Sequence, residues 1–301
     1  MNQQNPSGIQ SFIDYLKFEK RYSPHTIRSY HDDLVQFFDY LQTQFGVINL
    51  KEISHSIVRS WLASLKEEDL SARSINRKIS TLKSFFKFHL KNGGIVHTPM
   101  TKVIAPKMNK RLPVFIKETD TSSLISSLTI NTEDWDSLNA KIIFTLFYNT
   151  GMRLSELINL KENQVDFYKK QVKVLGKGNK ERIIPVSSDV IKTIEEYVQY
   201  KKKEYGETEN VLIVSAKGKK LYPKYAYNLV NKILSENIKT LVKKSPHVLR
   251  HTFATHLMNN GANLDAVKEL LGHASLATTQ VYTHNTIEKL KDVHKKAHPK
   301  A

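Results

Sequence analysis

Residues 23–46, SPHTIRSYHDDLVQFFDYLQTQFG, carry the clearest structural pattern in the chain. Ser23 suits a helix N-cap, Pro24 suits the first helical position, and Gly46 suits the residue that follows the last turn. Between them the apolar side chains recur at steps of three and four residues, which predicts one long amphipathic helix with a single buried face. These side chains are Ile27, Tyr30, Leu34, Phe37, Phe38 and Leu41.

The segments on either side show the same periodicity. An amphipathic stretch over Phe12–Phe18 precedes this helix. Two further helices are predicted at about Ser54–Lys66 and Ser71–Leu90, and Asn92-Gly93-Gly94 ends the second. We therefore expect residues 1–105 to form a small domain of four helices.

The composition then changes. Residues 98–113 read TPMTKVIAPKMNKRLP, with three prolines, four basic residues and no acidic residue. Such a segment is typical of an extended, positively charged linker. We place a basic linker at residues 106–113, which leaves residues 114–301 as a second domain.

The second domain is predicted to be mainly helical with a little sheet. Residues 171–186, QVKVLGKGNKERIIPV, set two β-rich runs around a glycine-rich turn, as in a β-hairpin. Another short strand is expected at Val211–Val214. The predicted helices are Ser188–Lys203, Pro223–Leu241, Pro246–Asn260, Asn263–Leu271, Ser275–Thr283 and Ile287–Lys296. The expected fold class is mainly α with a small β-sheet.

The composition narrows the class of function. The chain has 46 Lys and Arg against 29 Asp and Glu, a formal charge of +17, which favours a polyanionic partner such as nucleic acid. It has no cysteine, which excludes disulfide scaffolds, cysteine-ligated zinc and thiol nucleophiles. No apolar run is long enough to span a bilayer, and the first residues lack a signal-peptide pattern. We expect a cytoplasmic protein with no membrane partner.

Several motifs in the second domain are suited to holding an anion. His247 and Arg250 lie three residues apart at the start of a predicted helix, so they share a face beside the free N–H groups of the first turn. Arg153 stands at another helix start, and His273 follows a glycine that ends a helix. Two arginine forks and two imidazole donors can stabilise a pentacoordinate phosphoryl transition state without a metal.

Two more residues complete this chemistry. Tyr282 can supply a nucleophile, and Lys177, on the predicted hairpin, can protonate a leaving oxygen. A tyrosine with a pKa of about 10 needs positively charged neighbours that favour its phenolate at neutral pH. The four basic groups of the other motifs would be such neighbours.

Each residue alone also has an ordinary explanation. His247 and His251 have the spacing of a zinc pair, although no cysteine is available to complete a site. Arg153 could pair with Glu156 on a helix surface, Lys177 could be a solvated turn residue, and a helical tyrosine usually packs. Only the whole set in this order favours phosphoryl transfer.

The motifs also carry a resemblance. TGMRLSEL, GKGNKER, HVLRHTFATHL and LLGHASLATTQVYTH, together with the N-terminal FIDYLKFEKRYSPHTIRSYHDDLVQFFDYL, closely resemble the tyrosine recombinase family, specifically its Xer branch. The resemblance covers almost the whole chain. It implies a two-domain clamp, with a helical core-binding domain and an α-rich tyrosine recombinase catalytic domain.

The resemblance implies a site-specific recombinase that needs no cofactor and no metal. Tyr282 would attack the scissile phosphate, forming a 3′-phosphotyrosyl link and freeing a 5′-hydroxyl. The 5′-hydroxyl of a partner duplex would then attack this link and exchange the strands. The six catalytic residues it implies are Arg153, Lys177, His247, Arg250, His273 and Tyr282.

The resemblance also implies partners. These are a double-stranded DNA recombination site and a homo- or hetero-tetramer of recombinase subunits on two such sites. A second Xer-type recombinase and a septal DNA translocase are further candidate partners. Candidate DNA contacts are Arg73, Arg77, Lys83, Lys110 and Arg111, with Lys217, Lys219 and Lys220 as further phosphate contacts.

The biological role implied is resolution of chromosome dimers at cell division. Three alternatives stay open at this stage. The chain could be the integrase of a mobile element, a sequence-specific DNA-binding protein without catalysis, or an enzyme similar to type IB topoisomerases, which share the chemistry.

Overall fold

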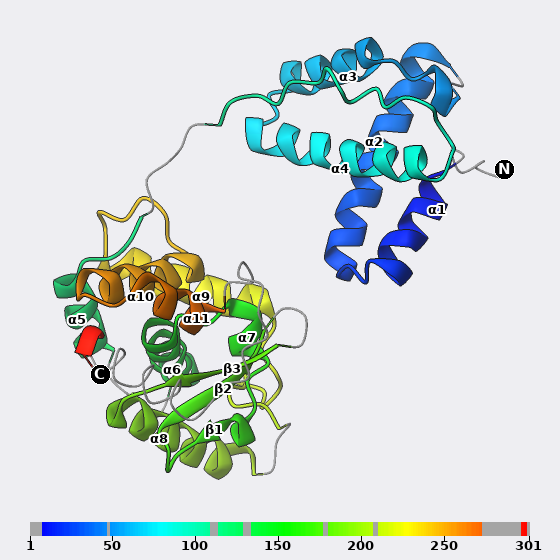
Figure 1. Cartoon of the computed structure of the whole chain (residues 1–301). Helices are drawn as coiled ribbons and strands as arrows, with labels where there is room; N and C mark the ends of the chain where they lie inside the picture. Colours follow the sequence, from blue (N-terminus) through cyan, green and yellow to red (C-terminus); the bar gives the residue numbers. More distant parts are fainter. Residues whose placement is uncertain are drawn as a thin grey trace. The chain divides into compact units, whose positions relative to one another are not determined.

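The chain divides into two compact units, Met1–Arg111 and Leu112–Ala301 (Figure 1). The structure, a computed structural model, describes residues 8–46, 49–108, 114–128, 134–176, 180–206, 210–272 and 296–299. Each unit has its own hydrophobic core.

The first unit is helical, as predicted. Its N-terminal helix passes into a π-helical segment at Tyr15–Glu19, and a single 3₁₀ turn lies at Leu50–Glu52. Ser23 accepts a hydrogen bond from a first-turn amide, so the predicted N-cap is confirmed, and Ser54 and Ser71 cap the next two helices in the same way. The α-helices are α1 (Ile9–Asp14), α2 (Pro24–Phe45), α3 (His55–Glu67) and α4 (Ala72–Lys91).

An aromatic core holds these helices together, and a buried ion pair joins two of them. Phe37 of α2 lies 4.9 Å from Trp61 of α3, between ring centroids. Asp33 of α2 is 1% exposed and accepts hydrogen bonds from Lys78 Nζ at 2.8 Å and Arg77 Nη1 at 2.5 Å, both on α4. Because a buried carboxylate needs such partners, this pairing fixes α2 against α4.

The second unit is helical around a small antiparallel sheet. The predicted hairpin is confirmed: Gln171 pairs with Pro185, and Leu175 pairs with Glu181. A two-residue strand, which the sequence pattern did not predict, extends the sheet to the order β1-β2-β3 among the described residues. The elements are α5 (Glu118–Ser127), α6 (Trp135–Thr150), α7 (Leu154–Ile158), a 3₁₀ turn at Glu162–Gln164, β1 (Val165–Asp166), β2 (Gln171–Leu175), β3 (Glu181–Pro185), α8 (Ser188–Tyr205), α9 (Pro223–Asn237), α10 (Pro246–Asn259) and α11 (Leu264–Leu271).

Helix α6 lies in the middle of this unit and packs on α8, α9 and α10 (Figure 1). It is buried on nearly every side, including Asn139, Ile143 and Phe147. A helix buried all round has no polar face, so it lacks the amphipathic period used to find helices in the sequence. For that reason α6 is not predicted by the sequence pattern.

The strand predicted at Val211–Val214 is wrong. This buried segment contributes only an isolated bridge between Val214 and Lys220. Its backbone oxygens are taken by side chains instead: Lys201 Nζ donates to Val211 O at 2.7 Å, and Asn139 Nδ2 donates to Val214 O at 2.9 Å. The apolar run is therefore buried without a neighbouring strand.

The other helix predictions differ mainly at their ends. Helix α9 ends at Asn237, earlier than predicted, because the backbone of Ile238 leaves the helical region, with φ of −130° and ψ of 84°. Asn237 Nδ2 donates to Ile233 O at 2.8 Å in this last turn. The helices predicted at residues 275–283 and 287–296 lie outside the described residues, apart from residue 296. Near the C-terminus, the backbone oxygen of Ala297 accepts a hydrogen bond from Asn260 Nδ2 at 3.0 Å.

Candidate active site

Arg153 is placed at a junction between two helices. Gly151, with φ of +57°, ends α6, and α7 begins one residue after Arg153. Glu156, on the first turn of α7, accepts a hydrogen bond from the Arg153 backbone N at 2.7 Å and another from its Nη1 at 2.8 Å. Glu156 is only 6% exposed, so its carboxylate is buried, although the Arg153 side chain is 32% exposed; this differs from the surface helix pair that such spacing usually forms.

Arg250 is buried on α10 and holds two backbone oxygens. Its Nη1 donates to Gly151 O at 2.6 Å, and its Nη2 donates to Leu271 O at 2.6 Å. Arg153 Nη2 donates to the next oxygen along the chain, that of Gly272, at 2.9 Å. Two residues 97 positions apart in the chain thus meet at the C-terminal end of α11, and the structure brings Arg153 and Arg250 together.

A third arginine, which the sequence analysis missed, completes the cluster. Arg182 of β3 is 4% exposed and donates to both carboxylate oxygens of Glu156, at 2.9 and 2.8 Å. Its Nε donates to Leu270 O at 2.7 Å. The signal in the sequence was its position. Arg182 stands two residues before the apolar Ile184 in a predicted strand, so the two side chains lie on the same, buried face.

We call Arg153, Arg182, Arg250 and Glu156 the arginine cluster. Three guanidinium groups face one carboxylate, which leaves two positive charges without a partner in the cluster. Burial and then the charges of Arg153 and Arg182 lower the pKa of Arg250 to about 10, so it is still protonated at neutral pH. Burial raises the pKa of Glu156, but Arg182 and Arg153 outweigh it and bring that pKa to about 2.

The cluster is suited to binding an anion. A guanidinium carries five N–H groups, and the described residues supply two acceptors each to the side chains of Arg153 and Arg250. Donors therefore remain for another acceptor. A buried excess of positive charge is costly unless an anion approaches it, and arginine forks match the oxygens of a phosphate.

His247 is exposed and lies one turn before Arg250, near the start of α10. The same helix start carries Ser245 at the N-cap, whose hydroxyl is buried and has no hydrogen-bond partner among the described residues. The imidazole of His247 and the guanidinium of Arg250, on one face of α10, add to the anion-binding character of this corner.

The other three predicted site residues, Lys177, His273 and Tyr282, lie outside the described residues. The structure does describe Gly176 and Gly272, the glycines immediately before Lys177 and His273. Gly176 closes the β2–β3 hairpin, with its N donating to Lys180 O at 2.7 Å, and a Cβ added there would lie 3.6 Å from Glu156 Oε1. Gly272 ends α11 at φ of +63°.

The predicted DNA contacts fall on the first unit and on the linker. Arg73, Arg77 and Lys83 are exposed residues of α4. Arg77 is also tied to α2, since its Nη1 donates to Ser29 Oγ at 2.6 Å as well as to Asp33. Lys110 and Arg111 lie outside the described residues. In the second unit, Lys217, Lys219 and Lys220 are exposed around the turn beside the bridge at Val214.

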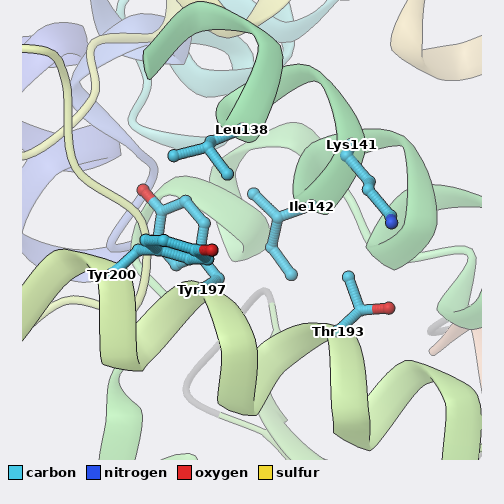
Figure 2. A pocket seen from close by; sticks show the side chains of 6 residues that line it. All are labelled: Leu138, Lys141, Ile142, Thr193, Tyr197 and Tyr200. Atoms are coloured by element: carbon cyan, nitrogen blue, oxygen red, sulfur yellow. The ribbon is translucent and has the colours of Figure 1, made fainter. Parts of the chain in front are cut away.

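A shallow hollow lies elsewhere in the second unit, between α6 and α8 (Figure 2). Its lining consists of Leu138, Lys141, Ile142, Thr193, Tyr197 and Tyr200. No residue of the arginine cluster lines it. In the described parts of the chain, no group of three or more His, Asp or Glu side chains could hold a metal ion, and no helix is long and apolar enough to cross a membrane.

Comparison with protein families agrees with this geometry. Residues 115–289 match the phage integrase family, and residues 9–93 match the phage integrase N-terminal SAM-like domain. The chain therefore belongs to the phage integrase family.

Individual relatives narrow the class. The chain is 37% identical to tyrosine recombinase XerC of Staphylococcus aureus (strain MSSA476), over 97% of this chain and 96% of that one. The present chain is a site-specific tyrosine recombinase of the Xer type, a DNA breaking and rejoining enzyme.

Solved structures share its fold. One is the XerH site-specific recombinase bound to difH substrate, with a TM-score of 0.70 and 23% identity over 96% of this chain and 84% of that one. Another is the Tn1549 transposon integrase in complex with circular intermediate DNA, with a TM-score of 0.68 and 18% identity over 94% of this chain and 98% of that one. The mainly helical fold class expected from the sequence is confirmed.

Proposed function

We propose that the chain cuts and rejoins DNA at the chromosome-dimer resolution site of its host, through a 3′-phosphotyrosyl intermediate on Tyr282. The single observation that carries this proposal is the arginine cluster, where Arg153 and Arg250 meet with an excess of positive charge. That excess is suited to one negatively charged group, and a scissile phosphate is such a group.

The reaction we propose has two balanced steps. The Tyr282 oxygen attacks phosphorus while the bond to the 5′-oxygen breaks; His247 takes the tyrosine proton and Lys177 donates a proton to the leaving oxygen. Arg153, Arg250 and His273 stabilise the added charge on the non-bridging oxygens. In the second step a 5′-hydroxyl of the partner duplex attacks the phosphotyrosine and gives its proton to Lys177, while the tyrosine oxygen leaves and takes back the proton from His247.

The partner of the reaction is double-stranded DNA. The chain carries a charge of +17, and two proteins that share its fold are the XerH recombinase bound to difH substrate and the Tn1549 transposon integrase in complex with circular intermediate DNA. We propose that Arg73, Arg77, Lys83, Lys110 and Arg111 contact phosphates, and that subunits act as a tetramer on two sites in the cytoplasm. A second Xer-type recombinase and a septal translocase are the proposed partners of that tetramer.

The test uses a nicked duplex carrying the host's dimer resolution site. The full chain is incubated with it, and a denaturing gel measures protein covalently attached to DNA. We expect an adduct with the wild-type chain and none with Tyr282→Phe, since only the phenol oxygen can form the link. Wild-type chain that binds this duplex tightly but forms no adduct, even with a second recombinase added, would contradict the proposal.

A mobile-element role is the second candidate, because the fold is shared with the Tn1549 transposon integrase. A bandshift separates the two roles. Binding to the dimer resolution site no tighter than to random duplex of equal length would reject the chromosomal role in favour of an element's attachment site.

A further inference from the structure

Among the described residues, the Glu156–Arg182 pair contacts the segments that lead to three of the predicted catalytic residues: Arg153, Lys177 and His273. Glu156 holds the backbone N and Nη1 of Arg153. Gly176, which precedes Lys177, packs against the pair: a Cβ added there would lie 3.6 Å from Glu156 Oε1 and 3.7 Å from Arg182 Nη1. Gly272, which precedes His273, packs against Arg182, with an added Cβ 3.1 Å from its Cδ.

The end of α11 is held in a specific way. Its last carbonyl oxygens, those of Leu270, Leu271 and Gly272, accept hydrogen bonds from Arg182, Arg250 and Arg153 respectively, at 2.7, 2.6 and 2.9 Å. Arg182 is the only one of these three arginines that was not predicted to touch the phosphate. It sits on β3, so it ties the hairpin, the start of α7 and the end of α11 to one another.

We propose that Arg182 is a positioning residue for the phosphoryl transfer. Through its bonds to Glu156 and to the Leu270 oxygen, it holds the guanidinium of Arg153 and the end of α11 in fixed positions relative to each other. Its role depends on the planar fork, because its Nε, Nη1 and Nη2 each hold a different acceptor atom. A lysine keeps the charge but cannot reach three fixed acceptors in one plane. This inference rests on the proposed function.

The experiment compares variants of the full chain on the nicked duplex described above. The variants are Arg182→Lys, Arg182→Met and the double variant Glu156→Gln/Arg182→Met. Lys173→Met is the matched control, because it removes one positive charge from the neighbouring strand β2, where Lys173 pairs with Glu181 at the surface. Three quantities are measured: the rate of covalent attachment at saturating protein, the Kd from bandshifts, and the melting temperature.

We expect Arg182→Lys to bind the duplex with nearly wild-type Kd but to form the covalent adduct about 10²-fold more slowly, the loss typical of an approximately 1 Å misplacement. Arg182→Met leaves Glu156 with Arg153 as its one charged partner, so it should also melt at a lower temperature. The double variant removes this buried carboxylate, which has lost both of its hydrogen bonds from Arg182, and should recover the melting temperature without recovering the rate. Lys173→Met should match the wild-type chain in all three quantities.

Two results would overturn the inference. One is adduct formation by Arg182→Lys or by the double variant at the wild-type rate. The other is a rate that falls only in proportion to lost binding or lost folded protein, which would make the role of Arg182 purely structural. Failure of the proposed function looks different, because then the wild-type chain itself forms no Tyr282-dependent adduct.

Discussion

Arg250 Nη2 donates to the backbone oxygen of Leu271 at 2.6 Å, two residues before His273 in the chain. The guanidinium that is proposed to bind the phosphate therefore also links α10 to the end of α11 through this hydrogen bond. Because the same side chain does both, its orientation is set before any DNA binds, which is the condition for electrostatic stabilisation of a transition state at low reorganisation cost.

Arg250→Lys is expected to lower the rate of covalent attachment about 10²–10³-fold, the usual loss when one preorganised donor is removed. Lysine keeps the charge but not the fork that reaches Gly151 O and Leu271 O. Single-turnover assays on the nicked duplex measure the rate. The control is Arg59→Lys, at an exposed position of α3, which should be unaffected. An Arg250→Lys chain as fast as wild type would contradict the assignment.

Glu156 should make stability depend on acid pH. Its pKa is about 2 in the folded chain against 4.5 as an ordinary value, so the folded state binds its proton more weakly. The stabilisation is present above pH 4.5 and is lost as the pH falls towards 2. It amounts to about 3 kcal/mol.

Denaturant unfolding of the wild-type chain and of Glu156→Gln measures this effect. The difference in unfolding free energy between them should be large at pH 7 and shrink as the pH falls from 4.5 to 2. Glu181→Gln is the control, since Glu181 pairs with Lys173 in solvent and should contribute little at any pH. A difference for Glu156→Gln that is the same at pH 7 and pH 2.5 would be inconsistent with the buried pair.

Gly151→Ala should destabilise the second unit by about 2–5 kcal/mol. Its φ of +57° costs an alanine about 1–2 kcal/mol, and the new Cβ would lie 2.4 Å from Phe253 Cδ1, which forces the core to shift. Gly261→Ala is a matched control, because Gly261 also ends a helix at positive φ (+86°) and has no atom within 4 Å of the added Cβ. Chemical denaturation should show only the first, smaller cost for Gly261→Ala. Equal losses in the two variants would refute the crowding argument.

Asp33→Asn should destabilise the first unit by about 3–5 kcal/mol, because it leaves the ammonium of Lys78 buried without its carboxylate. Trp61 reports on this unit: its ring lies 5.8 Å from Lys78 Nζ, and the other tryptophan, Trp135, belongs to the second unit. Fluorescence-detected unfolding in a Trp135→Phe background isolates the signal. Asp32→Asn is the control, since the Asp32 side chain is 63% exposed. If Asp32→Asn lowered the unfolding free energy as much as Asp33→Asn does, the prediction would be contradicted.

Local patterns in the sequence were enough for most of the helices. Ser23, Ser54 and Ser71 mark helix starts because a hydroxyl caps a free amide within three residues, an interaction that needs no tertiary contact. The β2–β3 hairpin is equally local. The segment at residues 211–214 shows the limit, since its apolar run looks like a strand and only the side chains of Lys201 and Asn139 decide otherwise.

The candidate site divides in the same way. The sequence alone determined which side chains could take part, through the order of Arg153, Lys177, His247, Arg250, His273 and Tyr282, and these six roles remain predictions. Only the tertiary structure decided what holds them. Arg182 lies 26 residues from Glu156 and 88 from Leu270, and no local period connects such positions. Their pairing comes from burial, because a charge taken out of water must find its partner wherever the fold brings one close.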